Sequence, residues 1–215
     1  MQLVEVELQT VRMEEQRHFY GARLALPITD EPGGFSVSVG DSRLRFREGQ
    51  APIYHLAFNV APDGLESAAS WISSVTPLLV DADGQSRQTF ESWQARSIYF
   101  KDADDNVMEC IARQRLTEFA GRTGLLSISE VGLPTEAVLE SARRLMRELD
   151  APVFGELSPG FTTLGDDHGL LLLPAAGRPW VPERVVQARP VPMRVLLQQG
   201  KKQHWLESPG GSLTA

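Results

Sequence analysis

Three copies of one short strand pattern carry the side chains best suited to chemistry in this chain. The copies span residues 5–10, 55–60 and 130–135, and they open with Glu5, His55 and Glu130. Each of these three side chains can bind a metal ion. Because side chains alternate across a strand, the first two copies present an apolar face and a polar face. The repeat therefore predicts strands that pack on a core with one face and line a polar site with the other.

The composition limits the classes of protein to which the chain can belong. It has 215 residues, of which 42% are hydrophobic and 23% charged, and this balance is typical of a soluble globular protein. No apolar run approaches the roughly 20 residues of a membrane span. The net charge of -7, without a basic patch, argues against a nucleic-acid partner. With Cys110 as the single cysteine and no signal-peptide pattern at the start, we expect a cytoplasmic protein.

Each strand opening is followed by a helical pattern and then by short alternating strands. This order predicts an α+β fold of repeated βαβββ units that form a cupped, mixed sheet. We expect two units in residues 1–112, a connector in residues 113–124 and a third unit in residues 125–200. The C-terminal residues 201–215 are rich in Gly and Ser near their end, and we expect them to be partly disordered.

Several motifs resemble the vicinal oxygen chelate superfamily. They are the strand openings at Glu5 and His55, the aromatic pair Phe19 and Tyr20 in the first helix, and above all the hairpin of residues 99–109. The superfamily includes glyoxalase I, extradiol dioxygenases, and the fosfomycin and bleomycin resistance proteins. The likeness covers residues 3–112 well and residues 125–173 more weakly. It implies that two units curl into a cup, with metal ligands on the first and last strands of each unit.

The resemblance places four residues of this chain at ligand positions. They are Glu5, Arg45, His55 and Glu109. Glu5, His55 and Glu109 suit a divalent ion such as Fe²⁺, Mn²⁺, Zn²⁺ or Ni²⁺. Arg45 cannot bind a metal, because its guanidinium keeps its proton. We expect Tyr99 and Glu109 to be catalytic, and the cup to contact substrate through the side chains Gln9, Arg45, Asn59 and Tyr99.

Arg45 also permits a site without metal. If its guanidinium lies between Glu5 and Glu109, it satisfies both carboxylates, and the cup becomes a salt-bridged pocket. Buried carboxylates need a partner, and either a metal ion or an arginine provides one. The sequence leaves both possibilities open.

The third unit is expected to repeat the fold without the chemistry. Aligning residues 166–171 with residues 104–109 puts Leu171 at the position of Glu109, so Glu130 lacks a carboxylate partner in its own unit. We therefore expect no metal there. An open sheet edge on this unit would favour a homodimer, with Arg178 and Trp180 contacting the other subunit.

These patterns predict a divalent-metal-dependent enzyme of the glyoxalase or dioxygenase type, acting on a small molecule with vicinal oxygens. Two alternatives remain. One is a metal-free protein that binds a small molecule, as resistance proteins do. The other is an inactive structural homodimer. The sequence identifies neither the substrate nor the metal.

Overall fold

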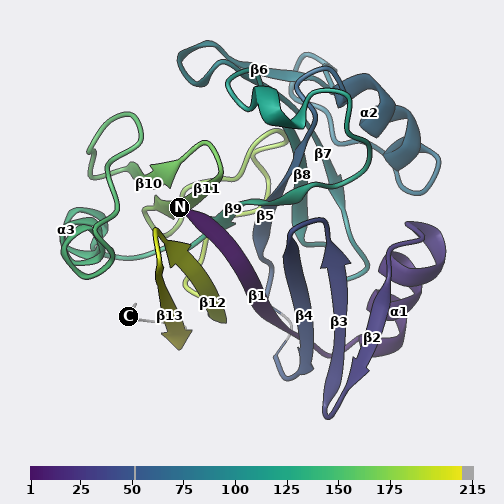
Figure 1. Cartoon of the computed structure of the whole chain (residues 1–215), viewed down its shortest axis with the longest axis horizontal. Coiled ribbons are helices and arrows are strands. Elements are labelled where there is room, and N and C mark those ends of the chain that lie inside the picture. The colour runs from purple at the N-terminus through teal and green to yellow at the C-terminus, as the bar shows by residue number, and fades with distance from the viewer. Residues whose placement is uncertain (51, 210–215) are drawn as a thin grey trace.

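A computed structural model describes residues 1–50 and 52–209, and within them thirteen strands form one mixed sheet against which the helices pack (Figure 1). The predicted α+β class is confirmed. Strand order along the main path of the sheet is β2-β3-β4-β1-β9-β5-β8-β7-β6, and the pairs β10-β11 and β12-β13 join it at β9 and β1. No described helix is both long enough and apolar enough to cross a membrane.

The first βαβββ unit follows the predicted order. Its first strand is parallel to its last, and the two hairpin strands lie beyond the last strand. The helical part is a short α-helix that continues into a π-helical turn. The elements are β1 (Gln2–Thr10), α1 (Met13–Arg17), the turn His18–Arg23, β2 (Ile28–Glu31), β3 (Gly34–Val39) and β4 (Ser42–Glu48).

The second unit has the same topology, with β5 parallel to β8. Every residue of β5 is buried: Leu56, Phe58 and Val60 belong to the main core, and the alternate residues face the opposite side of the sheet. The elements are β5 (His55–Val60), α2 (Leu65–Ser73), β6 (Gln88–Phe90), β7 (Ala95–Lys101) and β8 (Val107–Arg113). A single turn of 3-10 helix, Thr117–Phe119, lies in the predicted connector.

The third segment has the same order with one strand reduced to a single bridge between Val153 and Leu164. Its helix buries an apolar stripe that includes Val138, Ala142 and Leu145, and it ends at Asp150 in a left-handed conformation. Its first strand is parallel to its last. The elements are β9 (Ser127–Gly132), α3 (Val138–Leu149), β10 (Phe161–Asp166) and β11 (Gly169–Pro174).

The units pair differently from the sequence-based expectation. β5 of the second unit pairs antiparallel with β9 of the third, whereas β1 of the first unit pairs with β12 (Pro192–Gln199). β1 touches β9 at one position, Leu3 with Ile128. The second and third units therefore share a cup, and the first unit faces the β12-β13 hairpin. The prediction that residues 1–112 form one two-unit cup is wrong, because strand pairing between units is not encoded in the order of elements.

Two boundaries also need correction. Residues 192–199 form a strand as expected, but this strand belongs to the sheet of the first unit and not to the third unit. In the predicted disordered tail, Lys202–Pro209 form β13, which pairs along its whole length with β12. Residues 210–215 lie outside the described part of the chain.

The β7-β8 hairpin is tied to the first helix through Asp102. This buried carboxylate accepts hydrogen bonds from the Gln16 amide at 3.0 Å, the Tyr20 hydroxyl at 3.0 Å and the Asn106 side chain at 2.9 Å. It also accepts the backbone N–H groups of Asp104 and Asn106. Burial nevertheless raises the pKa of Asp102 to about 6.

We predict that Asp102→Ala lowers the free energy of unfolding by about 3 kcal/mol, because several buried donors lose their acceptor together. The difference in unfolding free energy between wild type and Asp102→Ala should grow as the pH falls from about 6 towards 4. Folded Asp102 takes up a proton near pH 6 and the unfolded side chain near 3.8, so acid favours folded wild type and not the variant. Urea unfolding at pH 4.5 and 7 measures both effects.

The matched control for this substitution is Asp105→Asn in the same turn. Asp105 is exposed and left-handed, with φ 63°, a conformation that Asn tolerates. Asp105→Asn should lower the free energy of unfolding by less than about 0.5 kcal/mol at both pH values. A gap between wild type and Asp102→Ala that narrows in acid would contradict the assignment of the buried proton to Asp102.

Candidate metal centre

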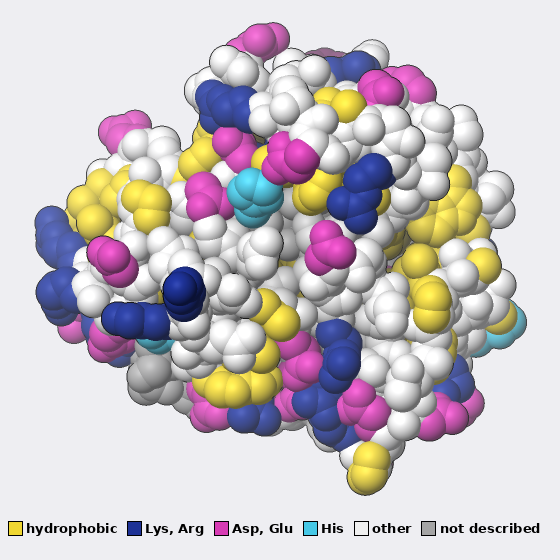
Figure 2. Space-filling view, viewed as in Figure 1, with side chains coloured by type: hydrophobic (Ala, Val, Ile, Leu, Met, Phe, Trp, Pro, Cys, Tyr) yellow, Lys and Arg dark blue, Asp and Glu magenta, His cyan; other side chains and the backbone are white. Residues whose placement is uncertain are grey.

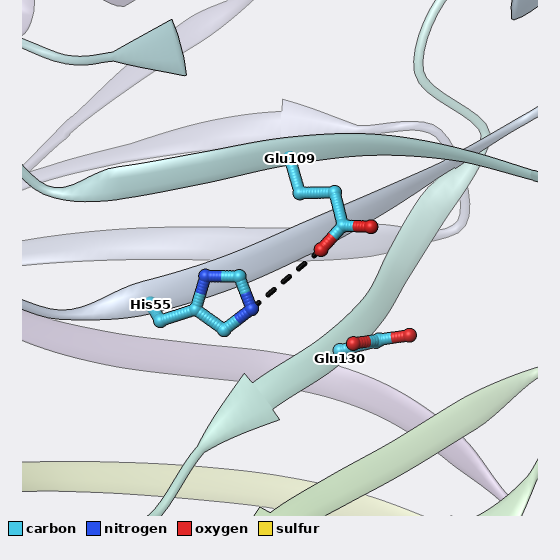
Figure 3. A group of neighbouring side chains, drawn as sticks. All are labelled: His55, Glu109 and Glu130. Atoms are coloured by element: carbon cyan, nitrogen blue, oxygen red, sulfur yellow. Dashed lines mark ion pairs between the residues drawn. The ribbon is translucent and has the colours of Figure 1, made fainter. Parts of the chain in front are cut away.

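Three buried side chains from three adjacent strands meet on the concave face of the sheet. His55 comes from β5, Glu109 from β8 and Glu130 from β9, and one ligand atom of each lies within 4.8 Å of the others (Figure 3). Strand register explains the meeting, because both glutamates lie opposite Ala57, two residues after His55 on the same face. Among the described residues, these three side chains form the group that could hold a metal ion.

The hydrogen bond of His55 fixes which ring nitrogen faces the site. Nδ1 lies 2.9 Å from the carbonyl oxygen of Val107, which can only accept, so Nδ1 carries the hydrogen. Nε2 then presents a lone pair to the Glu109 carboxylate, 3.6 Å away. Burial lowers the pKa of His55 to about 4, so the imidazole is neutral at pH 7. Both facing atoms are acceptors, and a proton or a metal ion would satisfy them together.

The two carboxylates of the group are disfavoured as anions. Burial, followed by the charge of Glu130, raises the pKa of Glu109 well above its usual range. Burial also raises the pKa of Glu130, although Arg113 opposes this shift. Arg113 is fully buried at the end of β8, and it donates to Glu130 and, at 3.2 Å, to the hydroxyl of Ser129. One arginine thus faces two buried acids, and a second cation would balance them.

One distance within the group matches the spacing of two ligands on a small divalent ion. Ligands about 2.1 Å from a tetrahedral ion lie about 3.4 Å from one another. The 3.6 Å between His55 and Glu109 is close to this value, and it is too long for a hydrogen bond. Imidazole with two carboxylates is a donor set that Fe²⁺, Mn²⁺, Zn²⁺ and Ni²⁺ accept.

A cavity of about 190 Å³ opens above the three side chains. Trp180 forms one wall, with its ring 4.5 Å from the His55 ring between centroids. Tyr99 lies opposite Glu109 on β7, and burial followed by the charge of Glu109 raises its pKa, so the phenol keeps its proton. The further lining residues are Phe90, Trp93, Phe161, Leu172, Arg178, Pro179, Val181 and Arg184.

Glu5 does not belong to this group, and the predicted convergence of Glu5, His55 and Glu109 needs correction. On β1 its carboxylate pairs with Arg45 at 2.8 Å and with Arg43 at 3.4 Å. Acidic and basic side chains gather over this part of the first unit (Figure 2). The alternative in which Arg45 neutralises Glu5 is the arrangement found, but Glu109 takes no part in it. The reason is again the strand pairing, which separates β1 from β5.

The four predicted substrate contacts are scattered. Tyr99 lines the cavity, whereas Asn59 is fully buried and donates to the hydroxyl of Ser127 at 3.0 Å. Gln9 and Arg45 are in the first unit, where the Gln9 side chain accepts from the backbone of Gln50. Of these four residues, Tyr99 alone is placed to touch a ligand above His55.

Glu130 is the candidate metal ligand that the sequence-based prediction omitted. The repeat itself placed it correctly, since it opens the third copy as His55 opens the second. The alignment of the hairpins was shifted by one residue: Leu172 lies opposite Gly132 and occupies the place equivalent to Glu109, while Leu171 points into the main core. Leucine still denies the third unit a ligand of its own. Glu130 finds its partners across the unit boundary.

We predict that Arg113→Met lowers the free energy of unfolding by about 3 kcal/mol or more, because it leaves Glu130 buried without its cation. Arg115→Met is the control: Arg115 is two residues along, 40% exposed in its side chain, and pairs with Asp167 at 3.5 Å. A surface pair of this kind is worth less than about 1 kcal/mol. Chemical unfolding of both variants provides the comparison, and equal losses would contradict the role given to Arg113.

Comparison with known proteins gives structural relatives. No family model and no curated protein matches the sequence. A proposed dioxygenase from Bacillus subtilis superposes with a TM-score of 0.56 at 13% identity, and the match covers 81% of this chain and 63% of that one. Glyoxalase I from Zea mays gives 0.53 at 14% identity, over 80% and 66%, and a mutant of the maize enzyme gives 0.55 at 14%, over 81% and 68%. This chain thus spans about two thirds of each relative. It has the vicinal oxygen chelate fold that its sequence motifs resemble.

Proposed function

We propose that this protein is a divalent-metal-dependent enzyme that acts on a small molecule with two adjacent oxygen atoms. One observation carries the proposal: in a buried site, the bare Nε2 of His55 faces the Glu109 carboxylate, with Glu130 beside them. Arg113 donates to Glu130, but no donor lies between the Nε2 lone pair of His55 and the Glu109 oxygen that faces it, and a cation there would satisfy both atoms. The fold shared with glyoxalase I supports the same reading.

His55, Glu109 and Glu130 would hold the ion, and three protein ligands leave coordination positions for a chelating substrate. A bound ion would act as a Lewis acid that polarises a substrate oxygen. Which metal binds depends on supply as well as on affinity, so Fe²⁺, Mn²⁺, Zn²⁺ and Ni²⁺ all remain candidates.

The surrounding residues have separate roles in this proposal. Val107 orients the His55 ring through its carbonyl, and Arg113 fixes one oxygen of Glu130 while the other stays available. Tyr99 is the proposed proton donor, because its neutral phenol lies beside Glu109 on the cavity wall. Glu109 is the proposed second catalytic residue. Leu172 and the aromatic walls exclude water from the floor of the cavity.

The main alternative is a metal-free protein that binds a small molecule. It draws support from Arg113, which already satisfies one of the two acids. The inactive homodimer stays a second alternative: β9 of the third unit pairs with β5, but among the described strands β10 pairs with β11 alone and leaves a sheet edge. The oligomeric state stays a prediction.

Metal titration distinguishes the two candidates. We expect wild-type protein, treated with chelator and then dialysed, to bind one equivalent of Mn²⁺, Ni²⁺ or Zn²⁺ in calorimetry. His55→Ala, Glu109→Gln and Glu130→Gln should each weaken binding at least about a hundredfold, since each removes one of three ligands.

Glu5→Gln is the informative control. Glu5 is held by Arg45 outside the group, so this variant should bind metal as wild type does. Wild-type protein that takes up none of these ions would sink the metalloenzyme proposal and favour the metal-free binder. If Glu5→Gln loses metal binding and Glu130→Gln keeps it, the metal site lies in the first unit.

A further inference from the structure

The loop between β11 and β12 forms the outer wall of the cavity. Backbone hydrogen bonds hold this loop in shape, including Trp180 N–H to the Val186 carbonyl and Gly177 N–H to the Ala188 carbonyl, both at 2.8 Å. Gly132 makes room for it, because a Cβ at this position would lie 2.8 Å from the Trp180 ring. The loop is therefore a packed part of the site, held by its own backbone hydrogen bonds and by the contact of Trp180 with Gly132.

The size and walls of the cavity suit one planar ring. A dry engineered cavity of about 150 Å³ binds benzene, and the space here is about 190 Å³, enough for a ring with small substituents. Apolar cavities with aromatic walls offer stacking and edge contacts to such a ring. The aromatic lining residues are Phe90, Trp93, Tyr99, Phe161 and Trp180.

Two arginines of the same loop line this cavity. Arg178 and Arg184 have no carboxylate within salt-bridge distance among the described residues, and Arg178 lies over the Phe161 ring at 5.0 Å. The one acid beside them in sequence, Glu183, pairs with Lys101 at 3.6 Å. In a chain of net charge -7, two unpaired guanidinium groups on one cavity form a local site for an anion.

We propose that the cavity binds a small aromatic carboxylate, whose carboxylate pairs with Arg178 and Arg184 while its ring lies between the aromatic walls. Guanidinium groups match the planar carboxylate through paired hydrogen bonds. Arg178 and Arg184 fix the orientation, because they are the two cationic side chains among the described lining residues. The inference rests on the proposed function for the reacting end of the ligand, whose adjacent oxygens would face the metal group.

The test uses benzoate, which has the ring and the carboxylate but no adjacent oxygens for a metal. Chelator-treated protein is titrated with benzoate and with uncharged benzyl alcohol, and the fluorescence of Trp93 and Trp180 reports occupancy. We expect saturable binding of benzoate that weakens with salt, and at least about tenfold weaker binding of benzyl alcohol, because it lacks the charged partner for the arginines.

Variants then test which arginines bind the carboxylate of benzoate. Arg178→Met and Arg184→Met should each weaken benzoate binding about tenfold and leave benzyl alcohol unchanged, while Arg178→Lys should recover part of the loss. Arg189→Met is the matched control, since Arg189 is exposed on the same loop but does not line the cavity. Its affinity should equal that of wild type. Both arginine sites are exposed, so near-ultraviolet circular dichroism should stay unchanged.

The outcomes separate this inference from the proposed function. Absence of benzoate binding, equal affinity for benzyl alcohol, or an effect of Arg189→Met as large as that of the Arg178 and Arg184 variants would overturn it. Because the titration contains no metal, benzoate binding can succeed where metal binding fails. A protein that binds metal but not benzoate would keep the proposed function and lose this substrate class.

Discussion

The antiparallel pairing of β5 with β9 is the constraint on which the candidate site depends. It places Glu130 opposite Ala57, while the parallel pairing of β5 with β8 places Glu109 opposite the same residue from the other side. His55, two residues earlier, therefore reaches both. A slip of one residue in either pair would move a carboxylate to the core face of the sheet. The irregular register between Ala57 and Phe58 lies beside this point, where bulges commonly adjust side chains at a site.

The protein balances buried and half-buried acids in two ways. In the first unit, Glu5 is matched by Arg45 and Arg43, so the polar face is a set of salt bridges that needs nothing else. Between the second and third units, Arg113 matches Glu130, whereas the partners of Glu109 are neutral: the His55 imidazole and the hydroxyls of Ser97 and Tyr99. The two sites therefore differ in how well arginines balance their acids, and not in the number of acids. The unbalanced site between the second and third units would gain from a cation, whereas the site in the first unit is already neutral.

The positions equivalent to His55, Ala57 and Glu109 in the third segment are Glu130, Gly132 and Leu172. The third segment thus has the same strand frame as the second unit, with a different side chain at each of the three places. Gly132 admits Trp180, and Leu172 gives the cavity an apolar side. Leucine in place of glutamate at position 172 removes a fourth metal ligand. The same leucine lines the space in which an organic molecule would lie.

The sequence alone determined the local structure. Alternation and helical spacing predicted the strand openings, the α3 stripe and the βαβββ order, because side-chain periodicity is a local property of the chain. His55, Glu109 and Tyr99, which alternation placed on the polar face, all line the cavity, and their roles stay predictions. Glu130 was recognised as an equivalent strand opening and then dismissed, since no residue of its own unit could complete a ligand set.

Tertiary structure decided which units face each other. The order of elements is compatible with β1 or β9 beside β5, and the choice depends on contacts between residues far apart in the chain, such as Ala57 with Glu130. The loop of residues 175–191 depends on long-range packing too. Trp180 was expected at another subunit, but its ring packs at a tilt against the His55 ring, because Gly132 leaves the space. The sequence thus specified the side chains that could do chemistry, and long-range strand pairing determined which of them meet.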